Sequence, residues 1–251
     1  MNIAGIIPAR FASTRFPGKP LMMIGDKTII HHVYTKASQA LKWVYVATDD
    51  QRIFDEVIKF GGKAVMTSPE HRSGTDRCAE ALMHIEKETK LKFDIVINIQ
   101  GDEPFIQAEQ ITKLSELFND SKTQISTLVK EITQKEDIFD PNKPKVVMDN
   151  MGFALLFSRS PIPYIRGLKQ EHWPAEFKFF KHIGIYGYRS GVLKEITLLP
   201  PSEIENAESL EQLRWLSNGY RIKTALTSHE SIGIDTPEDL EKALKLYEGK
   251  I

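Results

Sequence analysis

The side chains best suited to phosphate chemistry stand together in one loop, PARFASTRFPGKP, at residues 8–20. The loop contains cations, hydroxyl groups and a glycine: Arg10, Arg15, Lys19, Ser13, Thr14 and Gly18. Cations neutralise a triphosphate, hydroxyl groups donate hydrogen bonds to it, and glycine permits close approach of the backbone. The spacing of a Walker A loop is absent, and a solvated basic loop would have a similar composition. The spacing alone therefore leaves a triphosphate site and a plain surface loop both open.

A carboxylate that could bind a hard cation follows a hydrophobic run in NIQGDEP, residues 98–104. Asp102 stands beside a glycine at the end of the expected strand, where a carboxylate can hold a divalent cation that bridges phosphates. The alternation of side chains along a strand points Glu103 the other way. A Gly-Asp-Glu-Pro turn without a metal is the alternative interpretation.

A second carboxylate, Asp235, stands in GIDTPEDL, residues 233–240. This pattern predicts a helix start, with Thr236 as the N-cap, Pro237 as the first helical residue and Asp239 as the capping partner. That account leaves Asp235 without a structural task, so it is the candidate for a second metal ligand. Both interpretations can hold together, because the cap can position the ligand.

Two more segments offer binding groups of less specific chemistry. HRSGTDR (71–77) places a serine, a glycine and a threonine at an expected helix start, where they could bind a base or ribose or simply cap the helix. KHIGIYGYR (181–189) alternates so that His182 and Tyr186 share one strand face. That face could be the floor of a sugar site, although a lone histidine is more often structural.

The elements that must position these loops alternate between strands and helices in the first half of the chain. Short hydrophobic runs predict strands at 3–7, 43–47, 64–66 and 94–99. Apolar spacings of three and four predict helices at 30–41, 53–60, 75–88 and 108–119. This alternation is typical of an α/β fold with a mostly parallel, mixed sheet and helices on both faces. Ligands bind beyond the carboxyl ends of such strands, which is where the distinctive loops lie.

The segment at about 125–190 breaks this rhythm and predicts a β-rich insertion within a single domain spanning 1–251. Further elements are expected as strands at 145–148, 153–157, 182–188 and 222–226, and as helices near 210–216 and at 237–247. Four aromatic residues of the insertion are hard to bury within so small a unit: Trp173, Phe177, Phe179 and Phe180. We therefore expect them to be exposed in one chain and covered by a two-fold partner in a homodimer.

The composition limits the classes of function. A formal net charge of −1 over 251 residues gives no bulk attraction to nucleic acid or to an anionic membrane. Cys78 is the only cysteine, which excludes an internal disulfide, and its apolar neighbours predict a buried thiol. The start MNIAGIIPAR does not have the pattern of a signal peptide, and no run approaches the roughly 20 apolar residues that span a bilayer. We expect a cytoplasmic protein.

Taken together, the motifs resemble those of the 3-deoxy-manno-octulosonate (Kdo) cytidylyltransferase family, the CMP-Kdo synthetases. The match runs in order over nearly the whole chain, through IPARFASTRFPGKPL, ATDD, HRSGTDR, NIQGDEP, FSRSPIPY, KHIGIYGYR, ESLEQLR and GIDTPEDLEKA. The resemblance implies a nucleotide-diphospho-sugar transferase fold with a β-rich dimerisation segment. It also implies a magnesium-dependent nucleotidyltransferase that moves CMP from CTP to Kdo, releases pyrophosphate and activates Kdo for lipopolysaccharide biosynthesis.

The same resemblance implies roles for individual residues. The residues implied to hold the nucleotide are Arg10, Ser13, Arg15, Lys19, Ser73, Gly74, Thr75, Arg77 and Gln100. The residues implied to form the sugar pocket are Arg159, Arg166, His182, Tyr186, Glu211 and Gln212. Asp102 and Asp235 are the implied Mg²⁺ ligands, and Lys19, Arg15 and Asp102 are the implied catalytic residues. Arginine from the middle segment is expected to recognise the sugar carboxylate through two parallel hydrogen bonds.

Two rival functions have recognisable features. A CMP-sialic acid synthetase shares the IPAR start, but STRFPGKPL and ESLEQLR point away from it. A catalytically inactive sugar-nucleotide-binding protein of the same fold would not need Lys19, Asp102 and Asp235 together. The segment at 164–182 matches the family only loosely, so an 8-amino form of the sugar stays open as a substrate.

Overall fold

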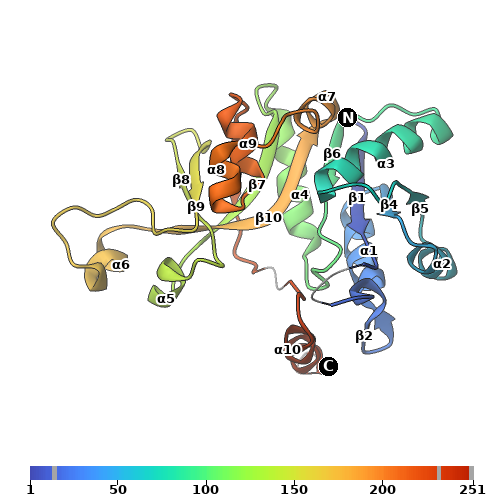
Figure 1. The fold of residues 1–251 in the computed structure, drawn as a ribbon, viewed down its shortest axis with the longest axis horizontal. Coiled ribbons are helices and arrows are strands. Elements are labelled where there is room, and N and C mark those ends of the chain that lie inside the picture. The colour runs from blue at the N-terminus through green and yellow to red at the C-terminus, as the bar shows by residue number, and fades with distance from the viewer. Residues whose placement is uncertain (13–15, 231–232, 249–251) are drawn as a thin grey trace.

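The computed structural model describes residues 1–12, 16–230 and 233–248, which build a nine-stranded sheet with helices packed on it (Figure 1). The strands of this sheet are β1 (Ile3–Ala9), β4 (Trp43–Thr48), β5 (Ala64–Met66), β6 (Ile95–Asn98), β7 (Ile125–Glu131), β8 (Lys145–Met148), β9 (Ala154–Ser158), β10 (Phe180–Arg189) and β11 (Ile222–Leu226). A separate hairpin consists of β2 (Met23–Ile24) and β3 (Lys27–Thr28).

The main sheet has the order β11-β7-β10-β6-β1-β4-β5, and β8 pairs with β10 and β9 beside it. Strands β6, β1, β4 and β5 run parallel to one another, and β7 runs parallel to β11. Strand β10 is antiparallel to both β6 and β7. The predicted mixed, mostly parallel α/β sheet is therefore confirmed, with β10 as the reversed strand at its centre.

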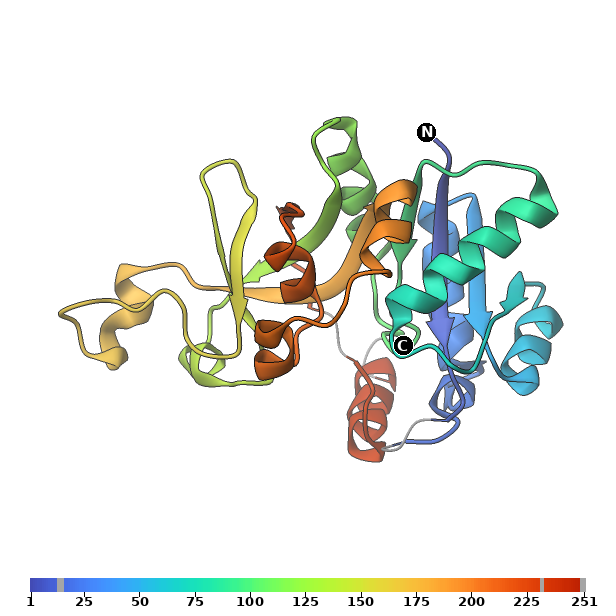
Figure 2. The same cartoon turned by 45° about the horizontal axis from the view of Figure 1, so that its top comes forward.

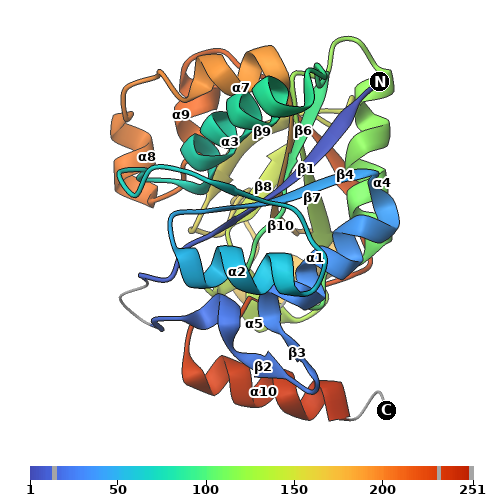
Figure 3. The same ribbon diagram turned by 90° about the vertical axis from the view of Figure 1, so that its right-hand side faces the viewer.

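Helices cover both faces of the sheet (Figures 1 and 3). The longer helices are α1 (Ile29–Ala40), α2 (Gln51–Lys59), α3 (Gly74–Thr89), α4 (Ala108–Glu116) and α10 (Pro237–Glu248). The shorter helices are α5 (Lys135–Phe139), α6 (Trp173–Glu176), α7 (Ser190–Ile196), α8 (Glu203–Glu208) and α9 (Gln212–Ser217), with 3-10 turns η1 (Lys19–Leu21), η2 (Leu117–Asn119) and η3 (Gln170–His172).

Two hydrophobic cores lie between these layers. On one face, α1, α2 and α4 bury Val33, Ile53 and Leu114 against the strands. On the other face, α3, α7 and α9 contribute their own apolar side chains, and Cys78 of α3 is fully buried there as predicted. Burial raises the pKa of the Cys78 thiol, so this cysteine has no activated nucleophile to offer.

The aromatic residues of the middle segment differ from the expectation. Trp173 and Phe179 are each only 1% exposed, so the expectation that they are exposed is wrong. Their rings stack with centroids 6.1 Å apart, and they pack with Ile138 of α5 in a small core of their own. The segment buries them because it folds back on itself beside α5, whereas Phe177 is 41% exposed and Phe180 is half-buried. Burying these aromatic residues thus does not by itself require a second subunit.

The last described helix, α10, packs against the hairpin near the start of the chain. Helix α10 packs against β2, and Ile24 of β2, Ile29 of α1, Ile234 and Ala243 form a buried cluster there (Figure 3). This packing brings the segment before α10 beside the loop that follows β1. Within the described residues, none of the helices is both long enough and apolar enough to cross a membrane.

Candidate active site

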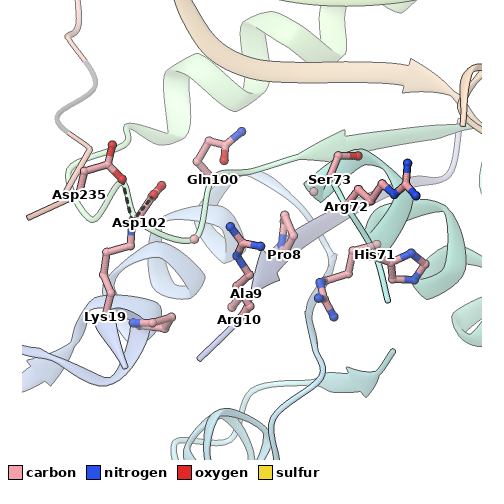
Figure 4. Close-up of a pocket in the computed structure, with 14 residues that line it drawn as sticks. Pro8, Ala9, Arg10, Lys19, His71, Arg72, Ser73, Gln100, Asp102 and Asp235 are labelled. Atoms are coloured by element: carbon pink, nitrogen blue, oxygen red, sulfur yellow. Dashed lines mark hydrogen bonds and ion pairs between the residues drawn. The ribbon is translucent and has the colours of Figure 1, made fainter. Parts of the chain in front are cut away.

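A pocket of about 250 Å³ lies beyond the carboxyl ends of β1 and β6 (Figure 4). Its lining comes from four separate segments of the chain: Pro8, Ala9, Arg10, Lys19, Pro20, His71, Arg72, Ser73, Gly74, Arg77, Gln100, Gly101, Asp102 and Asp235. Lys19, Asp102 and Asp235 gather at one end, and His71 and Ser73 lie at the other. The four motifs singled out for phosphate, metal and nucleoside binding therefore meet in one place.

Lys19 lies between the two predicted metal ligands. Its Nζ donates to Oδ2 of Asp102 at 2.7 Å and to Oδ1 of Asp235 at 3.2 Å. The side chain of Lys19 is 11% exposed, against 30% for Asp102 and 46% for Asp235. The ammonium group is therefore enclosed, while both carboxylates keep access to the pocket.

Two glycines explain how the backbone reaches this arrangement. Gly18 has a φ of 71°, and the 3-10 turn that follows it begins with Lys19. A side chain would strain that left-handed conformation. At Gly101, a Cβ would lie 2.7 Å from the carbonyl oxygen of Pro8. Glycine therefore lets the loop after β6 pass close to the end of β1, which positions the carboxylate that follows.

Asp235 is positioned by the start of α10. The N–H of Asp239 donates to Oγ1 of Thr236 at 3.3 Å, and the N–H of Thr236 donates to Oδ2 of Asp239 at 3.2 Å, so the predicted capping pair is formed. Oδ2 of Asp239 also accepts from the N–H of Asp235 at 3.3 Å. The preceding residue, Ile234, is fully buried and donates its N–H to the carbonyl of Asp102 at 3.0 Å. The cap and this backbone bond hold the two carboxylate residues side by side.

This donor set fits a magnesium ion that is bound jointly with phosphates. Mg²⁺ is commonly held by one or two carboxylates, with water and phosphate oxygens in the remaining positions. Asp102 and Asp235 supply two such carboxylates, and both form ion pairs with Lys19. No group of three or more His, Cys, Asp or Glu side chains converges on a metal position in residues 1–12, 16–230 and 233–248. The described part of the protein thus offers a shared site rather than a complete protein cage.

The far end of the pocket is built by the start of α3. Ser73 is the N-cap of this helix, and its Oγ accepts the N–H of Asp76 at 3.1 Å. Arg77 is only 3% exposed, and its guanidinium donates to Oδ2 of Asp49 at 2.8 Å and to Oγ1 of Thr67 at 2.6 Å. Arg77 therefore supports the pocket wall through its neighbours as well as lining it.

Gln100 connects this pocket to β10, because its Nε2 donates to the carbonyl of Gly184 at 2.9 Å.

His71 and Arg72 also line the pocket, although neither is among the individual nucleotide-binding residues predicted from the sequence. Both belong to the HRSGTDR motif, so treating the motif as a unit would have found them. The structure does not describe Ser13 and Arg15, and their predicted contacts with the nucleotide stay predictions.

Residues implied for the sugar form a buried polar layer behind the start of α3. The rings of His182 and Tyr186 lie 5.2 Å apart, and Tyr186 and Gln212 are 8% and 4% exposed. Tyr186 Oη and Gln212 Nε2 have no hydrogen-bond partner among the described residues. Thr75 Oγ1 donates to Oε2 of Glu211 at 2.8 Å, and burial raises the pKa of that carboxyl group. Buried polar atoms without partners are a reason to look for a polar ligand.

Arg159 and Arg166 do not line the described pocket. The guanidinium of Arg159 donates to the backbone carbonyls of Glu208, Pro141 and Ser209 at 2.6, 2.8 and 3.3 Å. Arg166 is exposed in the segment leading to α6, which projects away from the rest of the chain in Figures 1 and 2. Their contact with a sugar carboxylate stays a prediction.

The environment of His182 leads to a prediction about stability. Burial lowers the pKa of His182 from 6.5 to about 3, and its Nε2 lies 3.0 Å from Oγ1 of Thr127. Below pH 6.5 the unfolded chain binds a proton that the folded protein excludes until about pH 3, so stability is lost as the pH falls through this range. Between pH 7.5 and 5 this group should lower the free energy of unfolding by about 2 kcal/mol.

Urea unfolding at those two pH values measures this effect. His182→Gln should remove that part of the loss, whereas His172→Gln, at an exposed position, should leave it unchanged. The same pH dependence in the wild type and in His182→Gln would contradict the prediction.

The chain is similar to known proteins over nearly its whole length. Residues 4–224 match the family model described as Cytidylyltransferase. A Parabacteroides distasonis protein named 3-deoxy-manno-octulosonate cytidylyltransferase is 56% identical over 248 residues, which cover 97% of each chain. A protein of the same name from Thermodesulfovibrio yellowstonii is 52% identical over 244 residues, which cover 96% of each chain.

Solved structures agree with this result. The structure of a CMP:2-keto-3-deoxy-manno-octonic acid synthetase complexed with CTP matches with a TM-score of 0.91 and 42% identity over 100% of both chains. A cytidylyltransferase from Leptospira borgpetersenii matches with a TM-score of 0.63 at 17% identity, over 99% of this chain and 87% of that one. The second match supports the fold alone.

Proposed function

This chain belongs to the 3-deoxy-manno-octulosonate cytidylyltransferase family, and from that premise and the pocket geometry we infer that it transfers CMP from CTP to Kdo. The observation that carries this inference is the contact of Lys19 with Asp102 and Asp235 at one end of the pocket. A protein that only binds a sugar nucleotide has no need of two carboxylates in contact with a lysine of the loop at residues 8–20, the phosphate loop.

The reaction requires two anions, CTP and a sugar acid, to approach each other. The anomeric 2-hydroxyl oxygen of Kdo forms a bond to the α-phosphorus, the bond to the β-phosphate oxygen breaks, and pyrophosphate leaves with the bonding electrons. The hydroxyl proton passes to solvent. Arg10, Lys19 and Arg72, which line the pocket, neutralise the phosphates and hold them in place. Positioning and charge neutralisation supply most of the catalysis, so no covalent nucleophile is needed.

Mg²⁺ is the proposed cofactor, and Asp102 and Asp235 are the residues that would hold it. When bound, the ion supplies Lewis-acid stabilisation of phosphoryl charge and orients the reactants. Gln100 and the start of α3 hold the cytidine end, and the polar layer of His182, Tyr186, Glu211 and Gln212 receives the sugar.

A coupled pyrophosphate-release assay tests this function. Release should require Kdo, CTP and Mg²⁺ together, and ATP, GTP and UTP in place of CTP should give little turnover. Sialic acid and the 8-amino form of Kdo serve as competing sugars in parallel reactions. Equal turnover with sialic acid, or none with either form of Kdo, would refute the proposed function. Tight CTP binding without any turnover would indicate the inactive binding protein instead.

Recognition of the sugar carboxylate by arginine predicts a change in one Michaelis constant only. If Arg159 or Arg166 binds the carboxylate, replacing that arginine by lysine should raise the KM for Kdo and leave the KM for CTP nearly unchanged. Loss of a bidentate charge-assisted pair corresponds to roughly ten- to a hundredfold in kcat/KM. Because Arg159 already donates to three backbone carbonyls, Arg166 is the stronger candidate. If both KM values rise together, or neither moves, the arginine belongs to the scaffold.

We propose that the chain is a single domain that forms a homodimer through its β-rich middle segment. The proposed location is the cytoplasm. Strand β9 pairs only with β8 among the described strands, and Leu155 on it is 62% exposed. An apolar side chain on an unpaired edge is better covered than exposed. Light scattering at micromolar concentration should therefore give twice the mass of the chain, and the mass of one chain would refute the dimer.

A further inference from the structure

The ATDD motif is the one segment of the family resemblance that the proposed reaction does not use. It ends β4, whose last residue, Thr48, pairs in parallel with Ala9 at the end of β1. The two aspartates that follow have different partners. Asp49 accepts from the guanidinium of Arg77 in the pocket wall, as described above, and Asp50 accepts from Arg52.

Asp50 accepts three hydrogen bonds from Arg52. Its Oδ1 accepts from the backbone N–H of Arg52 at 3.0 Å and from Nε at 2.9 Å, while Oδ2 accepts from Nη2 at 2.7 Å. Asp50 is also the N-cap of α2. Its carboxylate therefore begins the helix and binds the guanidinium fork through two parallel hydrogen bonds.

The flat face of this guanidinium covers the start of the phosphate loop. Cζ of Arg52 lies 3.3 Å from the centroid of the Phe11 ring, in a cation–π contact. The opposite end of the loop meets the same residue. Gly18 donates its N–H to the Phe11 carbonyl at 2.9 Å, and a Cβ at Gly18 would lie 3.0 Å from Cζ of the ring. Phe11 thus joins both ends of the loop that carries Arg10 and Lys19.

We propose that Arg52, fixed by Asp50 and stacked on Phe11, is a positioning residue that sets the affinity for CTP. Arg52 is not among the described residues that line the pocket, so it acts through Phe11 and not on the phosphates. The side chain of Arg52 is 60% exposed, so Arg52 does not contribute to the packing of a hydrophobic core. The inference rests on the proposed function, because it takes CTP as the ligand of this loop.

Four variants test the separate parts of this contact. Arg52→Ala removes the stacked cation, and Arg52→Lys keeps the charge but loses the planar face and the fork. Asp50→Asn keeps an N-cap and weakens the charge-assisted fork. Phe11→Leu keeps apolar bulk and loses the ring. Each should raise the Kd for CTP with Mg²⁺, measured by calorimetry without Kdo, and the KM for CTP about five- to tenfold. The KM for Kdo and the melting temperature should change little.

The chain contains a matched control. Arg221 stacks on Phe153 with Cζ 3.7 Å from the ring centroid and pairs with Asp149 at 3.2 Å, beside β11 and outside the pocket lining. Arg221→Ala loses the same kind of contact and should leave CTP binding unchanged. The double variant Arg52→Ala/Phe11→Leu should bind CTP about as well as the weaker single variant, because the two residues act as a unit.

Three outcomes would overturn the inference. Unchanged CTP affinity in folded Arg52→Ala removes it directly, and so does wild-type affinity in Arg52→Lys, which would indicate a simple charge effect. Equal loss in Arg221→Ala would indicate a general loss of stability. Should Phe11→Leu fail to fold, Arg52→Ala still decides. If the wild type binds CTP but does not use Kdo, the proposed function fails while the calorimetric comparison still tests Arg52.

Discussion

Replacing Asp102 or Asp235 by asparagine should lower kcat by at least about 10²-fold, or roughly 3 kcal/mol of activation free energy. Asparagine keeps the volume of the side chain but removes the anionic oxygen that a hard cation requires. Each variant should also need more Mg²⁺ for half-maximal activity, because one of two carboxylate ligands has been weakened. Steady-state rates over a magnesium titration measure both effects.

Asp26→Asn is the control for this pair. Asp26 lies in the turn between β2 and β3, against which α10 packs, and it is exposed. The same change of charge there should leave kcat within about twofold, as for surface substitutions in general. Near-normal activity of Asp235→Asn at ordinary magnesium would show that Asp235 serves only the start of α10, and the metal assignment would then be wrong.

Lys19→Met should lower kcat/KM for CTP by about 10²- to 10³-fold. This is the range typical of the loss of one preorganised hydrogen-bond donor that stabilises developing charge in a transition state. Methionine keeps most of the unbranched stem, so the enclosed position stays filled. The magnesium dependence should move in the opposite direction from that of Asp102→Asn. Since the Lys19 ammonium contacts both carboxylates, it competes with a divalent cation for them, and its removal should lower the half-saturating Mg²⁺ concentration.

Lys59→Met, at a side chain that is 81% exposed on α2, is the matched control and should leave both constants unchanged. Lys19→Arg is also informative, because a planar guanidinium cannot replace a compact ammonium between two carboxylates and should restore little activity. Full activity in Lys19→Met would mean that the lysine only offsets the charge of the two aspartates.

Local patterns in the sequence predicted individual strands, one helix cap and one buried side chain. The strands at 64–66 and 145–148 match β5 and β8 residue for residue, because short apolar runs bounded by polar turns specify a strand locally. The capping pair of Thr236 and Asp239 was predicted for the same reason, since an N-cap involves residues only three apart. The buried thiol of Cys78 followed from the apolar face of its helix.

Partners far apart in the chain were beyond such patterns. Thr75 and Glu211 are 136 positions apart, and their hydrogen bond depends on α9 packing beside α3. Trp173 and Phe179 are residue types that are common at exposed interfaces. They are nevertheless buried against each other, because the segment folds back beside α5. Arg159 has the charge to bind a sugar acid, but its guanidinium donates to three backbone carbonyls that only the folded chain brings together.

The sequence by itself determined that Lys19 and Asp102 stand in loops after β1 and β6, since both loops follow apolar runs that form neighbouring parallel strands. It also determined that Asp235 precedes a helix. The tertiary structure alone decided that this helix packs on the β2–β3 hairpin and so brings Asp235 within 3.2 Å of a lysine 216 positions earlier. The physical reason is that Ile24, Ile29, Ile234 and Ala243 leave water only when the segment at 24–29 and the segment at 234–243 pack together.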